Sequence, residues 1–289
     1  MENIKTIEIN DSQYPKPLKK IIDPPRVLYY KGNLDIKNTP TLAVVGTRRC
    51  SNYGKQATIE IVTALSNTNI IIVSGMAHGI DTIAHKTALD NNIKTIAVLG
   101  TGIDNKSVYP QENVGLAKEI VKKEGAVISE YPPNTPGYKG NFPLRNRIIS
   151  GLSLGILVIE AKQRSGALIT ARYALQQKKQ LFALPGSIYS PNSQGCNYLI
   201  RKGATLIRSA KDILEELKIN SKLNLKIIKP ANKEEELVIK ILKDQKATYI
   251  DEIIQKTKIS PAKINSTLIE MERKQIIKNL GGNVFAIIN

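Results

Sequence analysis

Short apolar runs recur along the first three quarters of the chain, and most are followed by glycine or polar residues and then by a helical pattern. These runs have little polar alternation, which is typical of strands buried on both faces of a sheet. Strands that alternate with helices predict βαβ units and a parallel sheet. The runs are residues 41–45, 70–73, 95–99, 125–129, 154–159, 180–184 and 205–207, and the helical patterns lie near 53–67, 80–91, 111–123 and 167–177. We therefore predict a doubly wound, mostly parallel α/β domain over residues 37–218.

The flanking segments have a different character. Residues 1–36 are rich in proline and predict a helical turn and an extended arm rather than an independent domain. Residues 219–232 are polar and end near a proline, as a linker does. Residues 233–289 read as three helices followed by two short strands around a Gly-Gly turn, which is the winged-helix plan. Such small domains bind DNA or proteins, and the pattern alone does not decide between them.

The composition points to an anionic partner. The chain has 42 lysines and arginines against 25 acidic residues, a formal net charge of +17. The excess is spread over both halves of the chain, which disfavours a single charged tail. Nucleic acid is the usual partner of so basic a chain, although a plainly soluble, lysine-rich surface gives the same count.

The sequence gives little support for a metal-binding, secreted, membrane-spanning or nucleotide-binding protein. Cys50 and Cys196 lie far apart, and His78 and His85 have no neighbouring ligands at metal-site spacing. The chain starts without the apolar run of a signal peptide, and no apolar stretch approaches the roughly 20 residues of a membrane helix. Neither a phosphate-binding Gly-x-x-x-x-Gly-Lys motif nor a complete dinucleotide fingerprint is present. We expect a cytoplasmic protein without cofactor, metal or membrane contact.

Three loops that follow predicted strands look suited to phosphates. In open parallel sheets, ligands bind at the carboxyl ends of the strands, where glycines and helix N-termini admit anions. The candidate residues are Gly46, Thr47, Arg48 and Ser51 in the first loop, Gly75, Ala77 and Gly79 in the second, and Ser165 and Gly166 in the third. Three such loops on one sheet edge suit a polyanion better than one small ligand. Gly75 and Gly79 fit a simple tight turn equally well.

The segment of residues 140–153 adds an aromatic ring, an amide and two arginines just before an apolar stretch. Phe142 offers a ring of the kind on which bases stack, and Arg145 and Arg147 are costly near a core unless something anionic lies beside them. Cations beside a stacking surface are typical of single-stranded nucleic acid binding. The alternative is that the arginines pair with carboxylates and that Phe142 belongs to the core.

Ten motifs in order resemble one protein family. They are Tyr14-Pro15, Asp23-Pro24-Pro25, residues 45–48, residues 74–81, residues 97–104, Tyr109 to Asn113, Ser129 to Pro132, residues 142–153, residues 165–171 and Ala183 to Gly186. With these motifs the chain, from about residue 14 to residue 217, resembles the DprA/Smf family of bacterial DNA-processing proteins. The resemblance implies an extended Rossmann domain that binds single-stranded DNA, forms homodimers and helps load the RecA recombinase during natural transformation. It implies no catalytic activity.

The resemblance also implies DNA-contacting residues. They are Gly46, Thr47, Arg48, Lys139, Phe142, Arg145, Asn146, Arg147, Ser165 and Gly166. Thr47 departs from the usual Gly-Ser-Arg of the first loop but keeps the hydroxyl. No motif marks the dimer or RecA surface, so no residues are assigned to either.

Two other functions stay open. A related Rossmann-like group comprises nucleotide phosphoribohydrolases of the lysine-decarboxylase-like type, whose signature Pro-Gly-Gly-x-Gly-Thr-x-x-Glu has only residues 165–171 as a counterpart here, without the glutamate. Glu160, at the end of a strand, is a carboxylate that leaves the enzyme alternative possible, although it can equally pair with an arginine. The second alternative is a regulator that binds duplex DNA through residues 233–289.

Overall fold

The computed structural model describes residues 3–219, 230–245, 247–274 and 276–287. The chain divides into two compact units, Met1–Leu223 and Asn224–Asn289. The predicted linker, residues 219–232, falls largely on residues 220–229, which lie outside the described residues.

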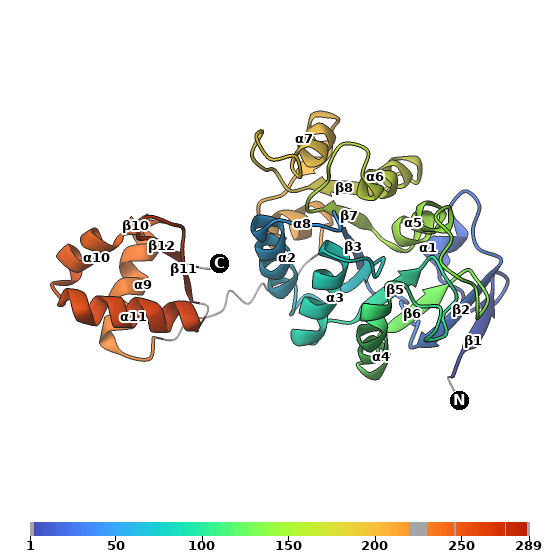
Figure 1. The fold of residues 1–289 in the computed structure, drawn as a ribbon, viewed down its shortest axis with the longest axis horizontal. Helices are drawn as coiled ribbons and strands as arrows, with labels where there is room; N and C mark the ends of the chain where they lie inside the picture. Colours follow the sequence, from blue (N-terminus) through green and yellow to red (C-terminus); the bar gives the residue numbers. More distant parts are fainter. Residues whose placement is uncertain (1–2, 220–229, 246, 275, 288–289) are drawn as a thin grey trace. The chain divides into compact units, whose positions relative to one another are not determined.

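The first unit is built on a nine-stranded sheet in the order β1-β2-β6-β5-β4-β3-β7-β8-β9 (Figure 1). From β6 to β9 in this order all neighbouring strands are parallel, which confirms the doubly wound, mostly parallel prediction. The strands are β1 (Lys5–Glu8), β2 (Val27–Gly32), β3 (Thr41–Val45), β4 (Ile71–Ser74), β5 (Thr95–Leu99), β6 (Ala126–Ser129), β7 (Gly155–Val158), β8 (Gln180–Ala183) and β9 (Thr205–Leu206).

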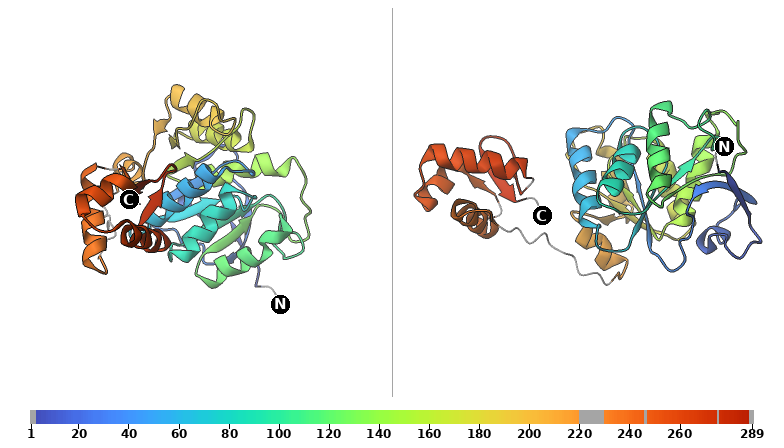
Figure 2. Two further views of the ribbon diagram at one scale, coloured as in Figure 1. Left: turned by 60° about the vertical axis from the view of Figure 1, so that its left-hand side comes forward. Right: turned by 90° about the horizontal axis from the view of Figure 1, so that it is seen from below.

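Helices cover both faces of this sheet (Figure 2). One face carries α1 (Lys16–Lys19), α5 (Asn141–Leu152), α6 (Gly166–Gln176) and α7 (Gln194–Arg201), and the other carries α2 (Asn52–Ala64), α3 (Ile80–Asp90), α4 (Val114–Lys122) and α8 (Ala210–Glu216). Successive side chains of a strand point to opposite faces, so Ala43 and Val45 pack in one core while Leu42 and Val44 pack in the other. This double burial is why the strands read as unbroken apolar runs.

The amino-terminal arm is part of the sheet. Strand β2 pairs antiparallel with β6, with Tyr30 opposite Ile128, and β1 pairs antiparallel with β2. The arm thus adds two antiparallel strands to the parallel sheet, with β1 at the edge. Strand β1 buries only Ile7, so its sequence carries almost no strand signal.

Helix α5 contains the segment with Phe142 and the two arginines, to which the sequence pattern assigned no helix. Pro143 is its third residue, where a missing N–H costs no intrahelical hydrogen bond. The helix can therefore begin at Asn141 despite the proline.

The second unit has three helices and a small antiparallel sheet in the order β10-β12-β11. Its elements are α9 (Lys233–Gln245), β10 (Thr248–Tyr249), α10 (Ile250–Thr257), α11 (Pro261–Arg273), β11 (Ile277–Asn279) and β12 (Val284–Ile287). The predicted three helices and two strands are present, and β10 is an additional strand; the winged-helix assignment stays a prediction. Among the described residues, no helix is long and apolar enough to cross a membrane.

Candidate nucleic-acid interface

The three predicted loops follow β3, β4 and β7, which are adjacent in the sheet order β4-β3-β7. Their contacts bring them together at the carboxyl edge. The Ile80 N–H donates to the Thr47 carbonyl at 3.3 Å, and the Thr47 N–H donates to the Glu160 carbonyl at 2.8 Å. A Cβ on Gly79, whose φ is +75°, would lie 2.4 Å from the Thr47 carbonyl oxygen. Only glycine therefore permits the second loop to approach the first so closely.

Glu160 holds the first loop in place. Its carboxylate accepts hydrogen bonds from the Ser51 hydroxyl at 2.5 Å, the Ser51 N–H at 2.9 Å and the Asn192 amide at 3.4 Å. Ser51 also caps α2 by accepting from the Gly54 N–H at 3.2 Å. Glu160 is only 1% exposed, and among the described residues its carboxylate is paired with Ser51 and Asn192 rather than with an arginine. The hydroxyl of Ser51 and the carboxylate of Glu160 serve the loop rather than facing a ligand.

The rest of the first loop divides between buried and exposed residues. Thr47 is buried, and its hydroxyl accepts from the Arg49 N–H at 3.3 Å. A Cβ on Gly46 would lie 2.6 Å from the Ile80 side chain, so this position packs closely against α3. Arg48 and Arg49 are exposed. The loop therefore presents arginine side chains on a rigid base.

The second loop is closed internally by Asp81. The Gly75 and Ala77 N–H groups donate to one carboxylate oxygen of Asp81, at 3.1 Å and 3.4 Å. Burial raises the pKa of Asp81 to about 6, although Arg145 and these hydrogen bonds oppose the rise. Both N–H groups are therefore occupied within the chain, which makes Asp81 a loop-capping residue.

Arg145 is buried, with 5% of its surface exposed. Its Nη1 donates to the carbonyls of Gly75, at 2.7 Å, and of Val98, and its Nε donates to Asn146 at 3.2 Å. Burial lowers the pKa of Arg145 to about 10, while Asp81 opposes this shift, so the guanidinium stays charged at neutral pH. Arg145 ties α5 to the carboxyl ends of β4 and β5.

Arg147 pairs with carboxylates, which is the alternative that the sequence left open. Its guanidinium donates to both oxygens of Glu130 and to the side chain and carbonyl of Asp23. It is 5% exposed. The side-chain amide of Asn146 donates to the Gly166 carbonyl at 3.3 Å, joining α5 to the start of α6. Arg145, Asn146 and Arg147 thus contact other parts of the chain, and their DNA contacts stay a prediction.

Phe142 lies where a cation and a second aromatic ring meet. The Arg48 guanidinium carbon is 5.9 Å from the centroid of the half-buried Phe142 ring, and the Tyr109 ring lies 5.5 Å away at a 49° tilt. Gly100 lies beneath the ring, because a Cβ there would be 2.9 Å from its Cδ1 atom. Lys139 is exposed on the loop that leads into α5. This Arg48–Phe142–Tyr109 cluster combines charge with accessible ring surface.

The third loop supplies the start of α6. Ser165 is its N-cap residue, and its hydroxyl oxygen is buried without a hydrogen-bond partner among the described residues. Gly166 is exposed, and a Cβ there would meet nothing within 4 Å. The loop therefore leaves open space beside a helix N-terminus, where anions are favoured.

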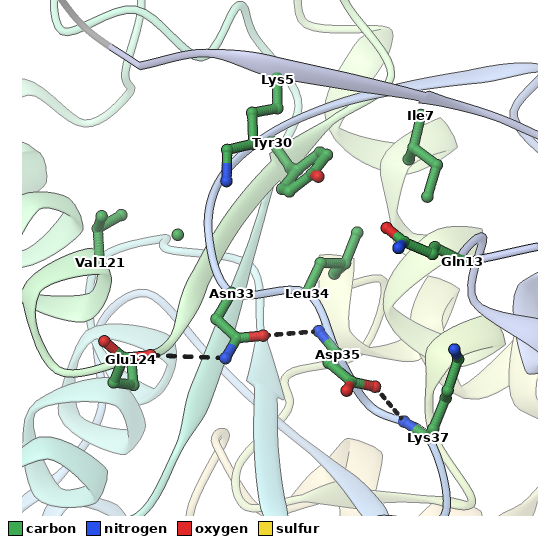
Figure 3. Close-up of a pocket in the computed structure, with 11 residues that line it drawn as sticks. Lys5, Ile7, Gln13, Tyr30, Asn33, Leu34, Asp35, Lys37, Val121 and Glu124 are labelled. Atoms are coloured by element: carbon green, nitrogen blue, oxygen red, sulfur yellow. Dashed lines mark hydrogen bonds between the residues drawn. The ribbon is translucent and has the colours of Figure 1, made fainter. Parts of the chain in front are cut away.

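A second region of the unit has a different electrostatic character. A hollow of about 510 Å³ lies between β1, β2 and the end of α4, near the amino end of β6 (Figure 3). Lys5 and Lys37 line it together with Asp35 and Glu124. The mixed charge gives a polyanion no net attraction there, so the carboxyl edge is the better candidate. Among the described residues, no group of three or more His, Cys, Asp or Glu side chains could hold a metal ion.

The sequence pattern missed three residues that shape the interface. Tyr109, Asp23 and Glu130 all lie in the motifs of the family resemblance, but nothing in their local sequence gave them a role. Their partners are Phe142 and Arg147, which only the folded chain brings near.

Comparisons with known proteins agree with this architecture. Residues 5–218 match the family described as DNA recombination-mediator protein A. The DNA processing protein DprA of Streptococcus pneumoniae is 46% identical over 215 residues, which cover 74% of this chain and 75% of that protein. The Bacillus subtilis protein of the same name is 43% identical over 217 residues, covering 75% of this chain and 72% of its own length.

Two solved structures are similar. The X-ray structure of the Streptococcus pneumoniae protein matches with a TM-score of 0.70 and 45% identity, covering 74% of this chain and 75% of that one. A Helicobacter pylori DNA processing protein A, described for its single-stranded DNA binding mode, matches with a TM-score of 0.66 and 34% identity, covering 75% of this chain and 96% of that one. On this evidence, the chain belongs to the DNA recombination-mediator protein A family.

Proposed function

We propose that this chain binds single-stranded DNA at the carboxyl edge of its sheet, with little base preference. The observation that carries the proposal is the placement of Arg48 over the half-buried ring of Phe142, at the edge where three loops meet. A cation beside a stacking ring holds a phosphate and an unpaired base together, and every base has a face that can stack. The Helicobacter pylori relative, described as binding single-stranded DNA, supports the same ligand here.

The contacts divide the predicted residues into two groups. Arg48 and Lys139 are exposed and form the direct contact surface with the half-buried ring of Phe142 and with the start of α6 at Ser165 and Gly166, where Gly166 is exposed. A supporting group, already engaged within the chain, fixes the loops and α5: Gly46, Thr47, Ser51, Gly75, Ala77, Gly79, Arg145, Asn146 and Arg147. A preformed surface of this kind loses little entropy when it binds.

The biological role that follows is that of a mediator without catalysis. We propose that the chain protects incoming single strands in the cytoplasm as a homodimer and helps load the RecA recombinase onto them. The phosphoribohydrolase alternative is disfavoured because Glu160, its one candidate carboxylate, is buried and fully hydrogen-bonded to Ser51 and Asn192.

The test is fluorescence anisotropy with a labelled oligothymidine and with a duplex of equal length, over a series of salt concentrations. We expect tighter binding to the single strand and a log–log salt slope of about −0.7 per phosphate contacted. Salt-independent binding, or a preference for the duplex, would overturn the proposal. The protein should also be incubated with nucleoside monophosphates. Chromatography of the mixture should then detect no free base.

A further inference from the structure

We propose that a hollow next to Phe142, walled by Tyr109, is a second subsite that takes one nucleotide of the bound single strand. The inference rests on the proposed function, because it assumes that a neighbouring base stacks on Phe142. It adds a residue and a pocket to which neither the sequence motifs nor the comparisons assign a role.

The hollow has a volume of about 340 Å³ and lies between residues 106–111 and residues 134–137. Two of its lining residues lie close to the Phe142 ring. Tyr109, which lines it, has its ring 5.5 Å from that of Phe142, and a Cβ on Gly137, which also lines it, would lie 3.4 Å from Phe142 Cζ. A strand that places one base on Phe142 therefore has the next nucleotide at the mouth of this hollow.

The walls of the hollow are held before any ligand binds. The carboxylate of Asp104 accepts from the Ser107 N–H at 3.1 Å and from the Asn134 N–H at 2.6 Å, so it joins the two loops. The Gly102 N–H donates to the Thr135 carbonyl at 2.8 Å. Partial burial alone would raise the pKa of Asp104, but these hydrogen bonds hold it below its ordinary value. The carboxylate therefore stays charged and bound to both loops at neutral pH.

The chemistry of the lining fits a nucleotide. Tyr109 is 48% exposed and offers a ring for stacking. Asn134 has a carboxamide without a hydrogen-bond partner among the described residues, and Gln111 donates its amide to the carbonyls of Lys106 and Val108, which leaves its oxygen free to accept. Lys106 is an exposed cation at the rim. The carboxamides of Asn134 and Gln111, a ring and a cation correspond to a base edge, a base face and a phosphate.

Charge distinguishes this hollow from the one in Figure 3. Among the described residues, Lys106 is the charged side chain that lines the hollow by Tyr109, and the nearby Asp104 carboxylate is engaged by two backbone N–H groups. Asp35 and Glu124 line the other hollow beside its two lysines. A polyanion is attracted to the first and gains little at the second.

The experiment measures the affinity of the full chain for an oligothymidine by anisotropy, with the wild type, Tyr109→Leu and Phe142→Leu. We expect Tyr109→Leu to weaken binding by about tenfold, which corresponds to 1.4 kcal/mol and lies within the range for one stacked base. A series of oligothymidines that each carry one abasic site tests this assignment. The wild type should bind more weakly when the abasic site lies at either of two neighbouring positions. The affinity of Tyr109→Leu should not change with an abasic site at one of these positions, and that of Phe142→Leu should not change with an abasic site at the other.

Further variants keep the test independent of the packing of Tyr109. Asn134 has a φ of +67°, which glycine adopts without strain, so Asn134→Gly removes the carboxamide and should weaken binding severalfold. Lys106→Gln should make the salt slope shallower by about 0.7. Tyr249→Leu, at a 62% exposed tyrosine of the second unit, is the matched control and should bind as the wild type does.

The outcomes separate the two proposals. If Phe142→Leu weakens binding while the Tyr109, Asn134 and Lys106 variants all bind as the wild type does, the subsite is overturned and the proposed function stands. If neither Phe142→Leu nor Tyr109→Leu changes the affinity, both are overturned. Thermal melts of each variant identify any loss of affinity that comes from unfolding.

Discussion

Arg147 in α5 and Asp23 in the amino-terminal segment form an ion pair with an Nε–Oδ2 distance of 3.2 Å across 124 residues of chain. The same guanidinium binds Glu130, which lies in the loop leading to α5. The helix that carries Phe142 is therefore held by the start of the chain and by its own preceding loop.

We predict that Arg147→Met lowers the free energy of unfolding by about 3 kcal/mol, because it leaves the largely buried Glu130 without its partner. Asp23→Asn should cost less than about 1 kcal/mol, because the Asp23 side chain is 80% exposed. Urea denaturation measures both. A stable Arg147→Met protein that no longer binds oligonucleotide would instead make Arg147 a direct DNA contact.

Arg48→Ala and Lys139→Glu should each weaken binding to single strands by about tenfold without unfolding the protein. Both residues are exposed in loops, where substitutions change stability by about 0.5 kcal/mol or less. Arg48→Ala should also reduce the salt slope by about 0.7, because one phosphate contact is lost. Anisotropy titrations at several salt concentrations measure the affinity and the salt slope, and circular dichroism checks that each variant is folded. An unchanged salt slope for Arg48→Ala would contradict the phosphate contact assigned to Arg48.

Phe142→Ala should cost about 1–3 kcal/mol of binding free energy if the ring stacks on a base. Because the ring is half-buried against Gly100, some loss of stability accompanies the change. The two effects are separated by measuring affinity well below the melting temperature of the variant. A lower melting temperature with unchanged affinity would place Phe142 in the core and end its stacking role.

The carboxyl of Asp81 predicts a pH dependence of stability. Burial raises its pKa in the folded chain to about 6, against about 3.9 in an unfolded one. Well below a pH of about 3.9 the group is protonated in both states, so its contribution to stability is complete there. It is lost as the pH rises through 6, by roughly 3 kcal/mol in total.

Asp81→Asn isolates this effect, since His85, whose pKa burial lowers to about 3, is present in both proteins. Relative to the wild type, the variant should gain stability between pH 4.5 and pH 7.5, as measured by urea denaturation at each pH. A difference between the two proteins that does not change with pH would contradict the raised pKa.

Residues 1–218 alone should fold and bind single strands within about tenfold of the full chain, because the three loops, α5 and the hollow by Tyr109 all lie within them. The comparison is an anisotropy titration of the shortened and full chains. A larger loss, more than about 1.4 kcal/mol, would move the main DNA site to the second unit.

The sequence predicted the elements whose signals are local and left out those that depend on distant partners. Residues 42–45 and 96–99 are apolar throughout because both sheet faces are covered, and this pattern is visible without the fold. The burial of Arg145 and Arg147 was not predictable in this way. Their partners are the carbonyls of Gly75 and Val98 and carboxylates up to 124 residues away, which no local pattern reveals.

The glycine beneath Phe142 has an evolutionary consequence. Any side chain at residue 100 would occupy the space of the ring, since even a Cβ would lie 2.9 Å from it. Residues 100 and 142 are therefore not free to vary independently. A relative that acquires a larger residue at the first position must replace or reorient the aromatic at the second, so the two positions should covary across the family.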